Sequence, residues 1–209
     1  MKVDYSLYLV TDRACVGKRN LTLCEAVEQA ILGGCRMVQL REYGVASLDF
    51  YKAAKEMKRL TDRYDIPLVI NNRVDIALAV RAAGIHIGQR DLPASVVRKM
   101  IGRDRLLGVS VTSVSEAVRA QEDGADYLGV GAMLPTRTKK DAKIVPVEEL
   151  CAIRRVVEIP IVVIGGINRK NAAKFMRMGA DGAAVVSAIL AQEDIRRAAE
   201  ELRRECDRV

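Results

Sequence analysis

The stretch Gly124-Ala125-Asp126-Tyr127-Leu128-Gly129-Val130-Gly131 contains the signals that decide the fold. Gly124 is suited to end a helix, and the apolar run at 126–130 that follows it indicates a short buried strand. The same order, with a glycine just ahead of an apolar run, recurs at Gly34, Gly84 and Gly179. Helix ends that lead repeatedly into buried strands are typical of βα units in series.

Eight such units account for the whole chain. The expected strands are 5–10, 37–40, 67–70, 85–87, 106–109, 126–130, 161–164 and 182–186. Capping-box patterns begin helices at Thr22 and Ser113, and prolines suited to a first helical turn stand at 93 and 146. Eight units in 209 residues predict a compact (β/α)8 barrel. An open doubly wound sheet is the alternative, although no Gly-x-Gly-x-x-Gly pattern follows the first strand.

The composition is that of one globular domain. Half of the 209 residues are apolar, so we expect a single domain over 1–209, without linkers. No apolar run approaches the ~20 residues of a membrane span, and the chain starts without a signal-peptide pattern. We therefore expect a cytoplasmic protein that does not bind membranes. The five cysteines are scattered without a Cys-x-x-Cys pair, so neither a disulfide framework nor a zinc site is indicated.

The formal charge of +7 raises the question of nucleic-acid binding. The charges are dispersed, however, and the helix expected over 193–208 alternates arginine with glutamate as a solvated helix does. The chain has no Trp and two Phe, so it lacks aromatic platforms for bases. We expect a small anionic partner and no nucleic acid, while a homo-oligomer stays compatible with the sequence.

The segment Gly129 to Ala142 has the composition of an anion-binding loop. Its donors are the hydroxyls of Thr136 and Thr138 and the side chains of Arg137, Lys139 and Lys140. Gly129 and Gly131 would open backbone N–H groups to close approach, and Pro135 would stiffen the loop. The alternative is a solvated basic loop, which the lysine pair alone would favour.

In a barrel, residues that follow the strands meet at one face regardless of their distance in sequence. The candidates are Gln39, Arg41, Tyr43, Asn71, Asn72, Gln89, Asp91, Ser110, Thr136, Thr138, Lys139, Gly165, Gly166, Val186 and Ser187. Gly165, Gly166 and Ser187 are suited to bind a phosphate monoester. Arg41, Lys139 and a metal near Asp91 would suit a second, more highly charged group.

Seven segments, taken in order, resemble the thiamine phosphate synthase family. They are Val38-Gln39-Leu40-Arg41-Glu42, Ile70-Asn71-Asn72-Arg73-Val74-Asp75, His86-Ile87-Gly88-Gln89-Arg90-Asp91, Gly108-Val109-Ser110, Pro135-Thr136-Arg137-Thr138-Lys139, Ile164-Gly165-Gly166-Ile167 and Val186-Ser187-Ala188-Ile189. The resemblance implies a Mg²⁺-assisted transferase that joins hydroxymethylpyrimidine diphosphate to a thiazole phosphate and releases pyrophosphate.

The resemblance also implies three sets of site residues. The pyrimidine diphosphate would be bound by Gln39, Leu40, Arg41, Glu42, Tyr43, Asn71, Ser110 and Lys139. The thiazole phosphate would be bound by Thr136, Arg137, Thr138, Gly166, Val186 and Ser187, and magnesium by Asn72 and Asp91. Arg41, Ser110 and Lys139 would act in catalysis by stabilising charge on the leaving pyrophosphate.

Two positions depart from the family pattern, which usually has Lys at Tyr43 and Asp at Asn72. Because both changes remove charge, a non-catalytic phosphate-ligand sensor is one alternative function. The related thiazole tautomerase is another, although Thr112 stands where that isomerase carries its acid–base histidine. His86, the only histidine, is interpreted as a packed polar residue without a role, and Glu42 as an internal ion-pair partner.

Overall fold

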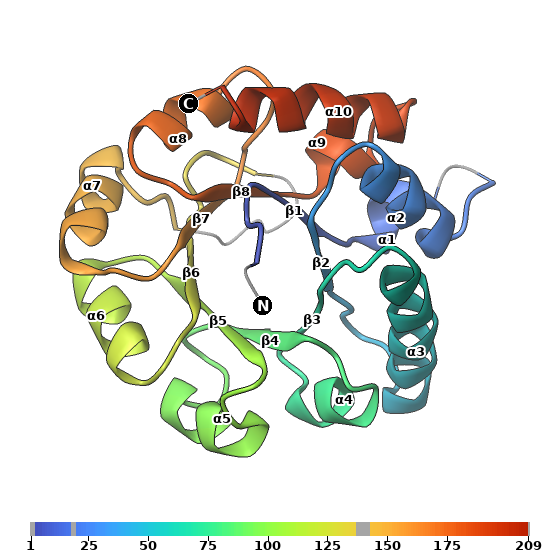
Figure 1. Cartoon of the computed structure of the whole chain (residues 1–209), viewed down its shortest axis with the longest axis horizontal. Coiled ribbons are helices and arrows are strands. Elements are labelled where there is room, and N and C mark those ends of the chain that lie inside the picture. Colours follow the sequence, from blue (N-terminus) through green and yellow to red (C-terminus); the bar gives the residue numbers. More distant parts are fainter. Residues whose placement is uncertain (1–2, 18–19, 137–142, 209) are drawn as a thin grey trace.

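The structure is a computed structural model that describes residues 3–17, 20–136 and 143–208. Eight parallel strands pair in chain order and close into a barrel, because β8 also pairs with β1. The strands are β1 (Leu7–Val10), β2 (Met37–Leu40), β3 (Leu68–Asn71), β4 (Gly84–Ile87), β5 (Leu106–Val111), β6 (Tyr127–Val130), β7 (Ile161–Ile164) and β8 (Gly182–Val185). The predicted (β/α)8 barrel is thereby confirmed, and Figure 1 shows the ring of strands inside its helices.

Helices connect successive strands and cover the outside of the barrel. They are α1 (Arg13–Val16), α2 (Leu23–Leu32), α3 (Ser47–Arg63), α4 (Val74–Ala79), α5 (Ala94–Ile101), α6 (Val114–Glu122), α7 (Val147–Val156), α8 (Ala172–Arg177), α9 (Ser187–Leu190) and α10 (Ile195–Cys206). The four-residue helices α1 and α9 were not predicted, since they are too short to show a helical period. No helix within the described ranges is long and apolar enough to cross a membrane.

One of the two predicted capping boxes forms completely. The Thr22 hydroxyl accepts from the Glu25 amide, and the Glu25 carboxylate accepts from the Thr22 amide at 2.7 Å. At α6 the Ser113 hydroxyl caps as expected, but the Glu116 carboxylate reaches one residue further back. It accepts from both the amide and the hydroxyl of Thr112, at 2.6 and 3.0 Å, because that residue offers two donors together. Glu116 therefore ties the end of β5 to the start of α6.

Three of the four glycines predicted to end helices have that role. Gly34, Gly124 and Gly179 adopt φ values of 107°, 90° and 95°, which side chains rarely allow. The interpretation of Gly84 was wrong, because α4 ends at Ala79 and Gly84 begins β4. A Cβ there would lie 2.5 Å from the Leu106 carbonyl oxygen, so glycine is required for the approach of β5.

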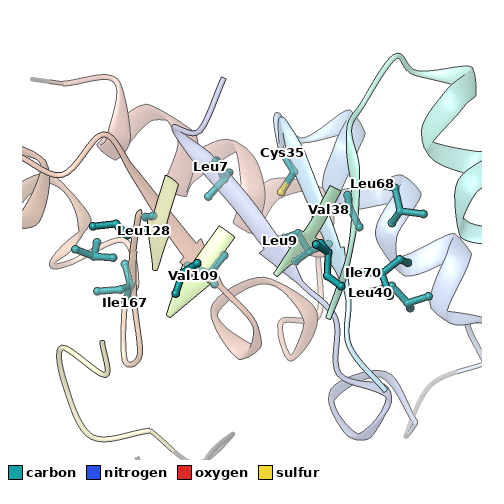
Figure 2. Close-up of a cluster of buried hydrophobic side chains, with 14 of the residues drawn as sticks. Leu7, Leu9, Cys35, Val38, Leu40, Leu68, Ile70, Val109, Leu128 and Ile167 are labelled. Atoms are coloured by element: carbon teal, nitrogen blue, oxygen red, sulfur yellow. The ribbon is translucent and has the colours of Figure 1, made fainter. Parts of the chain in front are cut away.

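The strands bury both of their faces, as parallel strands in a barrel do. Along β1, Leu7 and Leu9 belong to the outer core under the helices, while Tyr8 and Val10 lie in the inner core. Figure 2 shows part of the outer core, where apolar side chains of neighbouring strands meet. The inner core consists of Tyr8, Val10, Met37, Val69, Tyr127, Val162 and Ala184. This core closes the barrel interior below the site.

The helix α10 packs directly against α2. A Cβ on Gly33, at the end of α2, would lie 2.3 Å from the Arg196 carbonyl oxygen and 2.6 Å from the Ala199 Cβ. An ion pair of 3.0 Å joins Arg203 of α10 to Asp4, just ahead of β1. The first and last βα units are thus held together by strand pairing, helix packing and charge, as Figure 1 shows for the blue and red elements.

Candidate active site

A pocket of about 510 Å³ opens at the carboxyl ends of the strands. Most of the predicted site residues line it. Those residues are Gln39, Arg41, Tyr43, Asn71, Asn72, Asp91, Ser110, Thr136, Gly166, Val186 and Ser187. They come from β2 to β8 and the loops that follow, so the barrel brings them together as expected. Arg137, Thr138 and Lys139 lie outside the described residues.

Two predicted residues do not line the pocket. Leu40 is fully buried in the outer core, where its side chain faces the helices. The Glu42 carboxylate forms an ion pair of 2.6 Å with Arg13, which agrees with its interpretation as an internal ion-pair partner. The alternation of strand residues explains Leu40, because its neighbours Gln39 and Arg41 point the other way, into the pocket.

Arg41 is held at the pocket by the segment that follows β1. Its amide donates to the Thr11 hydroxyl at 3.0 Å, and its guanidinium lies 3.5 Å from the Asp12 carboxylate. The guanidinium carbon also lies 4.3 Å from the centre of the Tyr43 ring, within the range of a cation–π interaction. Tyr43 therefore contacts the neighbouring cation and brings no charge of its own.

Two residues with side-chain oxygens suited to bind a metal follow neighbouring strands, β3 and β4. Asn72 follows β3, adopts φ 61°, and donates its amide to the His86 carbonyl at 2.9 Å. Asp91 follows β4, and its Oδ2 accepts from the Gly88 amide at 2.7 Å. Both residues line the pocket, and the described residues contain no cluster of three or more His, Cys, Asp or Glu that could hold a metal.

This donor set fits magnesium. A carboxylate and an amide oxygen are hard ligands, and Mg²⁺ usually takes one or two protein ligands while water and substrate phosphates supply the others. A cage built only from protein carboxylates is not needed for such an ion. Asn72 and Asp91 are therefore suitable as a partial magnesium site beside a diphosphate.

A chain of buried hydrogen bonds crosses the barrel under the pocket. The Gln39 amide nitrogen donates to the Tyr8 hydroxyl at 2.8 Å, and the Tyr8 and Tyr127 hydroxyls are 2.9 Å apart. The Tyr127 hydroxyl lies 3.1 Å from His86 Nδ1, and His86 Nε2 lies 2.8 Å from the Ser110 hydroxyl. These hydrogen bonds thus connect two predicted substrate-binding residues, Gln39 and Ser110, through Tyr8, Tyr127 and His86, none of which was predicted to have a role in the site.

Burial keeps the aromatic members of this chain uncharged. It lowers the pKa of His86 to about 4, and it raises the pKa values of Tyr8 and Tyr127 above their ordinary range. His86 is 8% exposed and therefore neutral at physiological pH. Sequence reasoning missed these partners because Tyr127 lies 41 residues from His86 and 119 from Tyr8.

The loops after β6 and β7 are joined by backbone hydrogen bonds. The Met133 amide donates to the Ile164 carbonyl at 2.9 Å, and the Leu134 amide donates to the Gly165 carbonyl at 3.1 Å. Gly165 and Gly166 have φ values of 93° and 70°. A Cβ on Gly166 would lie 2.6 Å from the Leu134 Cβ, so glycine is needed for both the backbone shape and the close contact.

The two glycines predicted to open the anion-binding loop both line the pocket, but only Gly131 lies outside the strand. Gly129 lies buried within β6, where a Cβ would be 3.0 Å from His86 Cε1, so its amide belongs to the sheet and not to a loop. Gly131 follows the strand, and a Cβ there would be 2.2 Å from the Ile164 carbonyl oxygen. The expectation for Gly129 was therefore wrong, because the absent side chain makes space for the histidine ring.

This chain is similar to known proteins in both sequence and structure. The family model for thiamine monophosphate synthase matches residues 7–189. The thiamine-phosphate synthase of Clostridium beijerinckii is 59% identical over 204 residues, covering 98% of this chain and 97% of its own, and that of Clostridium tetani is 56% identical over 200 residues, covering 96% and 95%. The solved thiamine phosphate pyrophosphorylase of Pyrococcus furiosus superposes with a TM-score of 0.88 at 39% identity, covering 98% of this chain and 96% of its own.

Proposed function

Because the chain belongs to the thiamine monophosphate synthase family, we propose that the pocket at the carboxyl ends of its strands is where it makes thiamine phosphate. Its function is that of a thiamine-phosphate synthase, a transferase of thiamine biosynthesis. The substrates are hydroxymethylpyrimidine diphosphate and the phosphate of a hydroxyethylthiazole. The products are thiamine phosphate and pyrophosphate.

The reaction exchanges one bond for another. The bond between the pyrimidine's methylene carbon and a diphosphate oxygen breaks, and the departing pyrophosphate keeps the electron pair. The lone pair of the thiazole nitrogen then forms the new carbon–nitrogen bond. Because neither step needs a proton to move, the site requires positive charge and hydrogen-bond donors more than an acid–base pair.

The pyrimidine diphosphate subsite is proposed between the ends of β2, β3 and β5. Gln39, Tyr43 and Asn71 line it, and Arg41, Ser110 and Lys139 stabilise the charge that develops on the leaving pyrophosphate. Leu40 and Glu42 support this region from behind, through the outer core and the ion pair with Arg13. The neutral His86 agrees with a reaction that does not use an acid.

The thiazole phosphate subsite is proposed on the opposite side, at the ends of β6, β7 and β8. Its residues are Thr136, Arg137, Thr138, Gly166, Val186 and Ser187. The hydrogen bonds between the loops after β6 and β7 support this assignment, because they join the two loops that carry Thr136 and Gly166. Placing the two subsites across one pocket brings the attacking nitrogen toward the methylene carbon.

Magnesium would be held by Asn72 and Asp91. When bound, it supplies charge neutralisation of the diphosphate, which makes pyrophosphate a better leaving group. Both residues line the pocket that also contains the proposed pyrimidine diphosphate subsite, which supports this assignment. Asp91 is oriented by the Gly88 amide, which binds only one of its two carboxylate oxygens.

The observation that carries the proposal is the convergence, in one pocket, of the Arg41 side chain and the glycine-rich turn at Gly165 and Gly166. Purified protein should be incubated with both substrates and Mg²⁺, and the products separated chromatographically. We expect thiamine phosphate and pyrophosphate in equal amounts. Rearrangement of a thiazole precursor alone would instead indicate the tautomerase, and binding of phosphorylated ligands without either product would indicate the sensor.

A further inference from the structure

The hydrogen-bond chain under the pocket has a direction that follows from counting hydrogens. We propose that Gln39, Tyr8 and Tyr127 hold His86 as its Nε2–H tautomer, and that His86 is a positioning residue which turns the Ser110 hydroxyl hydrogen toward the pocket. The assignment adds a role for the only histidine of the chain, which the reaction itself does not use.

The direction is set at Tyr8. This hydroxyl accepts a hydrogen from the Gln39 amide, and the described residues form no other hydrogen bond with it except the one to Tyr127. If Tyr127 donated to Tyr8, the Tyr8 hydrogen would have no acceptor although the side chain is 1% exposed. A buried donor without a partner costs roughly 1–3 kcal/mol. Tyr8 therefore donates to Tyr127.

The remaining links follow from this first one. The Tyr127 hydrogen then needs an acceptor of its own. Among the described residues the remaining hydrogen-bond partner of this hydroxyl is His86 Nδ1 at 3.1 Å, so Tyr127 donates to Nδ1. A neutral imidazole with an acceptor at Nδ1 carries its hydrogen on Nε2. Nε2 then donates to the Ser110 oxygen at 2.8 Å, and the Ser110 hydroxyl hydrogen, which no member of the hydrogen-bond chain accepts, is left to face the pocket.

The barrel reserves space for the chain of hydrogen bonds. Gly108 stands opposite both His86 and Tyr127 in the strand register. A Cβ on Gly108 would lie 2.3 Å from the Tyr127 hydroxyl and 2.5 Å from His86 Nδ1, at the hydrogen bond itself. Gly129, opposite Ser110, makes the corresponding space beside the imidazole. The neighbouring strands β5 and β6 thus both have a glycine at the level of the barrel where these hydrogen bonds lie.

The consequence for the substrate rests on the proposed function. A hydroxyl that accepts a hydrogen bond becomes a better donor, since hydrogen bonds in a series polarise one another. Ser110 is therefore presented to the pyrimidine diphosphate as a donor with a fixed orientation. Its carbonyl oxygen is held as well, because it accepts from the Gln89 amide at 2.8 Å.

The tautomer is directly measurable because the chain has a single histidine. The protein should be labelled with ¹⁵N-histidine, and long-range ¹H–¹⁵N spectra recorded near neutral pH without substrates. We expect the chemical shift of an unprotonated nitrogen at Nδ1 and of a protonated nitrogen at Nε2. A predominant Nδ1–H tautomer, or an imidazolium, would overturn the proposed direction.

A substitution at Tyr127 tests whether its hydroxyl orients His86 or whether its ring only fills space in the core. Tyr127→Phe keeps the ring but removes the hydrogen to Nδ1, so we expect mixed tautomers and about a fivefold higher KM for the pyrimidine diphosphate, with little change for the thiazole phosphate. Tyr5→Phe is the matched control, because its ring centre lies 5.2 Å from that of Tyr127 while the described residues form no hydrogen bond with its hydroxyl. Equal effects of both variants on the tautomer and on KM would contradict the proposal.

A second pair of variants tests the donor to Ser110. His86→Gln keeps a side-chain N–H that can reach the serine, and His86→Leu does not, so Gln should retain more kcat/KM for the pyrimidine diphosphate. Equal losses would argue against positioning. The NMR result on the free protein does not depend on turnover. Failure of the synthase assay with an Nε2–H histidine would therefore refute the function and leave the hydrogen-bond direction intact.

Discussion

Asn72 shows how one residue can depart from its family pattern and still suit its place. Its φ of 61° lies in the left-handed region, which asparagine adopts more readily than other non-glycine residues. The amide side chain also presents an oxygen at the same reach as the aspartate it replaces. Asparagine therefore suits the backbone conformation at this position. The negative charge of an aspartate, however, would bind a magnesium ion more strongly.

We predict that Asn72→Asp lowers the Mg²⁺ concentration needed for half-maximal activity. The geometry of the oxygen stays the same, and a negative charge adds attraction for the cation. The maximal rate need not rise, because the same charge lies close to the departing pyrophosphate. Activity should be measured against Mg²⁺ concentration for wild type and variant.

Asp91→Asn completes this test by removing the remaining carboxylate. We expect activity to be lost at ordinary Mg²⁺ concentrations and partly restored at high Mg²⁺. A half-saturating concentration that stays unchanged in Asn72→Asp, or wild-type behaviour of Asp91→Asn, would show that the metal is bound elsewhere.

The lysine pair at 139 and 140 gives a second prediction with its control built in. Lys139 directly follows Thr138 in the anion-binding loop and is proposed to stabilise the leaving group, whereas Lys140 has no assigned role. Lys139→Ala should lower kcat/KM on the order of 10²–10³-fold, the typical cost of removing one donor aimed at developing charge. Steady-state rates for Lys139→Ala and Lys140→Ala compare the two positions, and similar values would remove the assignment of Lys139.

Ser187 gives a third prediction, which tests whether the two subsites are assigned correctly. Ser187→Ala should raise the KM for the thiazole phosphate much more than the KM for the pyrimidine diphosphate, because the hydroxyl is proposed to bind only the former. Varying each substrate in turn gives both constants. The opposite ranking would mean that the subsites are exchanged.

At the scale of elements, the sequence predicted every strand of the barrel, and each predicted boundary lies within two residues of the observed one. β2 and β7 have the predicted bounds. β2 is flanked by Arg36 and Arg41, and β7 by Pro160 and Gly165, so both ends of each apolar stretch are marked in the sequence. Gly84 misled the prediction, since glycine also stands where two backbones approach closely. A single sequence does not distinguish these two uses.

The candidate site was predictable only as far as its residues follow strands. Arg41 and Asn72 were identified in this way, because the carboxyl ends of barrel strands meet at one face. The hydrogen-bond chain through Tyr8, His86 and Tyr127 was not, because it depends on which side chains from distant strands lie at one level of the barrel. That level is set by strand register, which the apolar pattern alone does not give.

The role of Gly84 leads to a prediction at the scale of two strands. Gly84→Ala would place its Cβ 2.5 Å from the Leu106 carbonyl oxygen, so β4 and β5 must separate. We expect a loss of about 1–3 kcal/mol in the free energy of unfolding, as for other overpacked sites. Gly17→Ala is the control, because its Cβ would make an ordinary contact of 3.4 Å with the Arg13 carbonyl oxygen. Urea unfolding of both variants should show a much smaller change for Gly17→Ala.

At the scale of the whole molecule, His86 makes stability depend on pH. The folded protein has a His86 pKa of about 4, below the value of about 6.5 that a histidine has in an unfolded chain. As pH falls from about 6.5 to 4, the unfolded state binds a proton that the folded state does not, so the free energy of unfolding decreases. The shift corresponds to on the order of 3 kcal/mol.

The measurement for this fifth prediction is urea unfolding of wild type and His86→Gln at several pH values between 7 and 4. Glutamine does not titrate, so the variant should lose less stability over this range than the wild type. Parallel curves for the two proteins would show that His86 binds protons equally well in the folded state.

The pairing of β1 with β8 also has a consequence for how the protein is made. β1 emerges early from the ribosome and gains β2 as a neighbour soon afterwards, but its other edge has no partner until residues 182–185 have been synthesised. The helix that packs on Gly33 follows later still. The growing chain therefore carries an open sheet edge through most of translation, a state in which strands readily pair with the wrong partner.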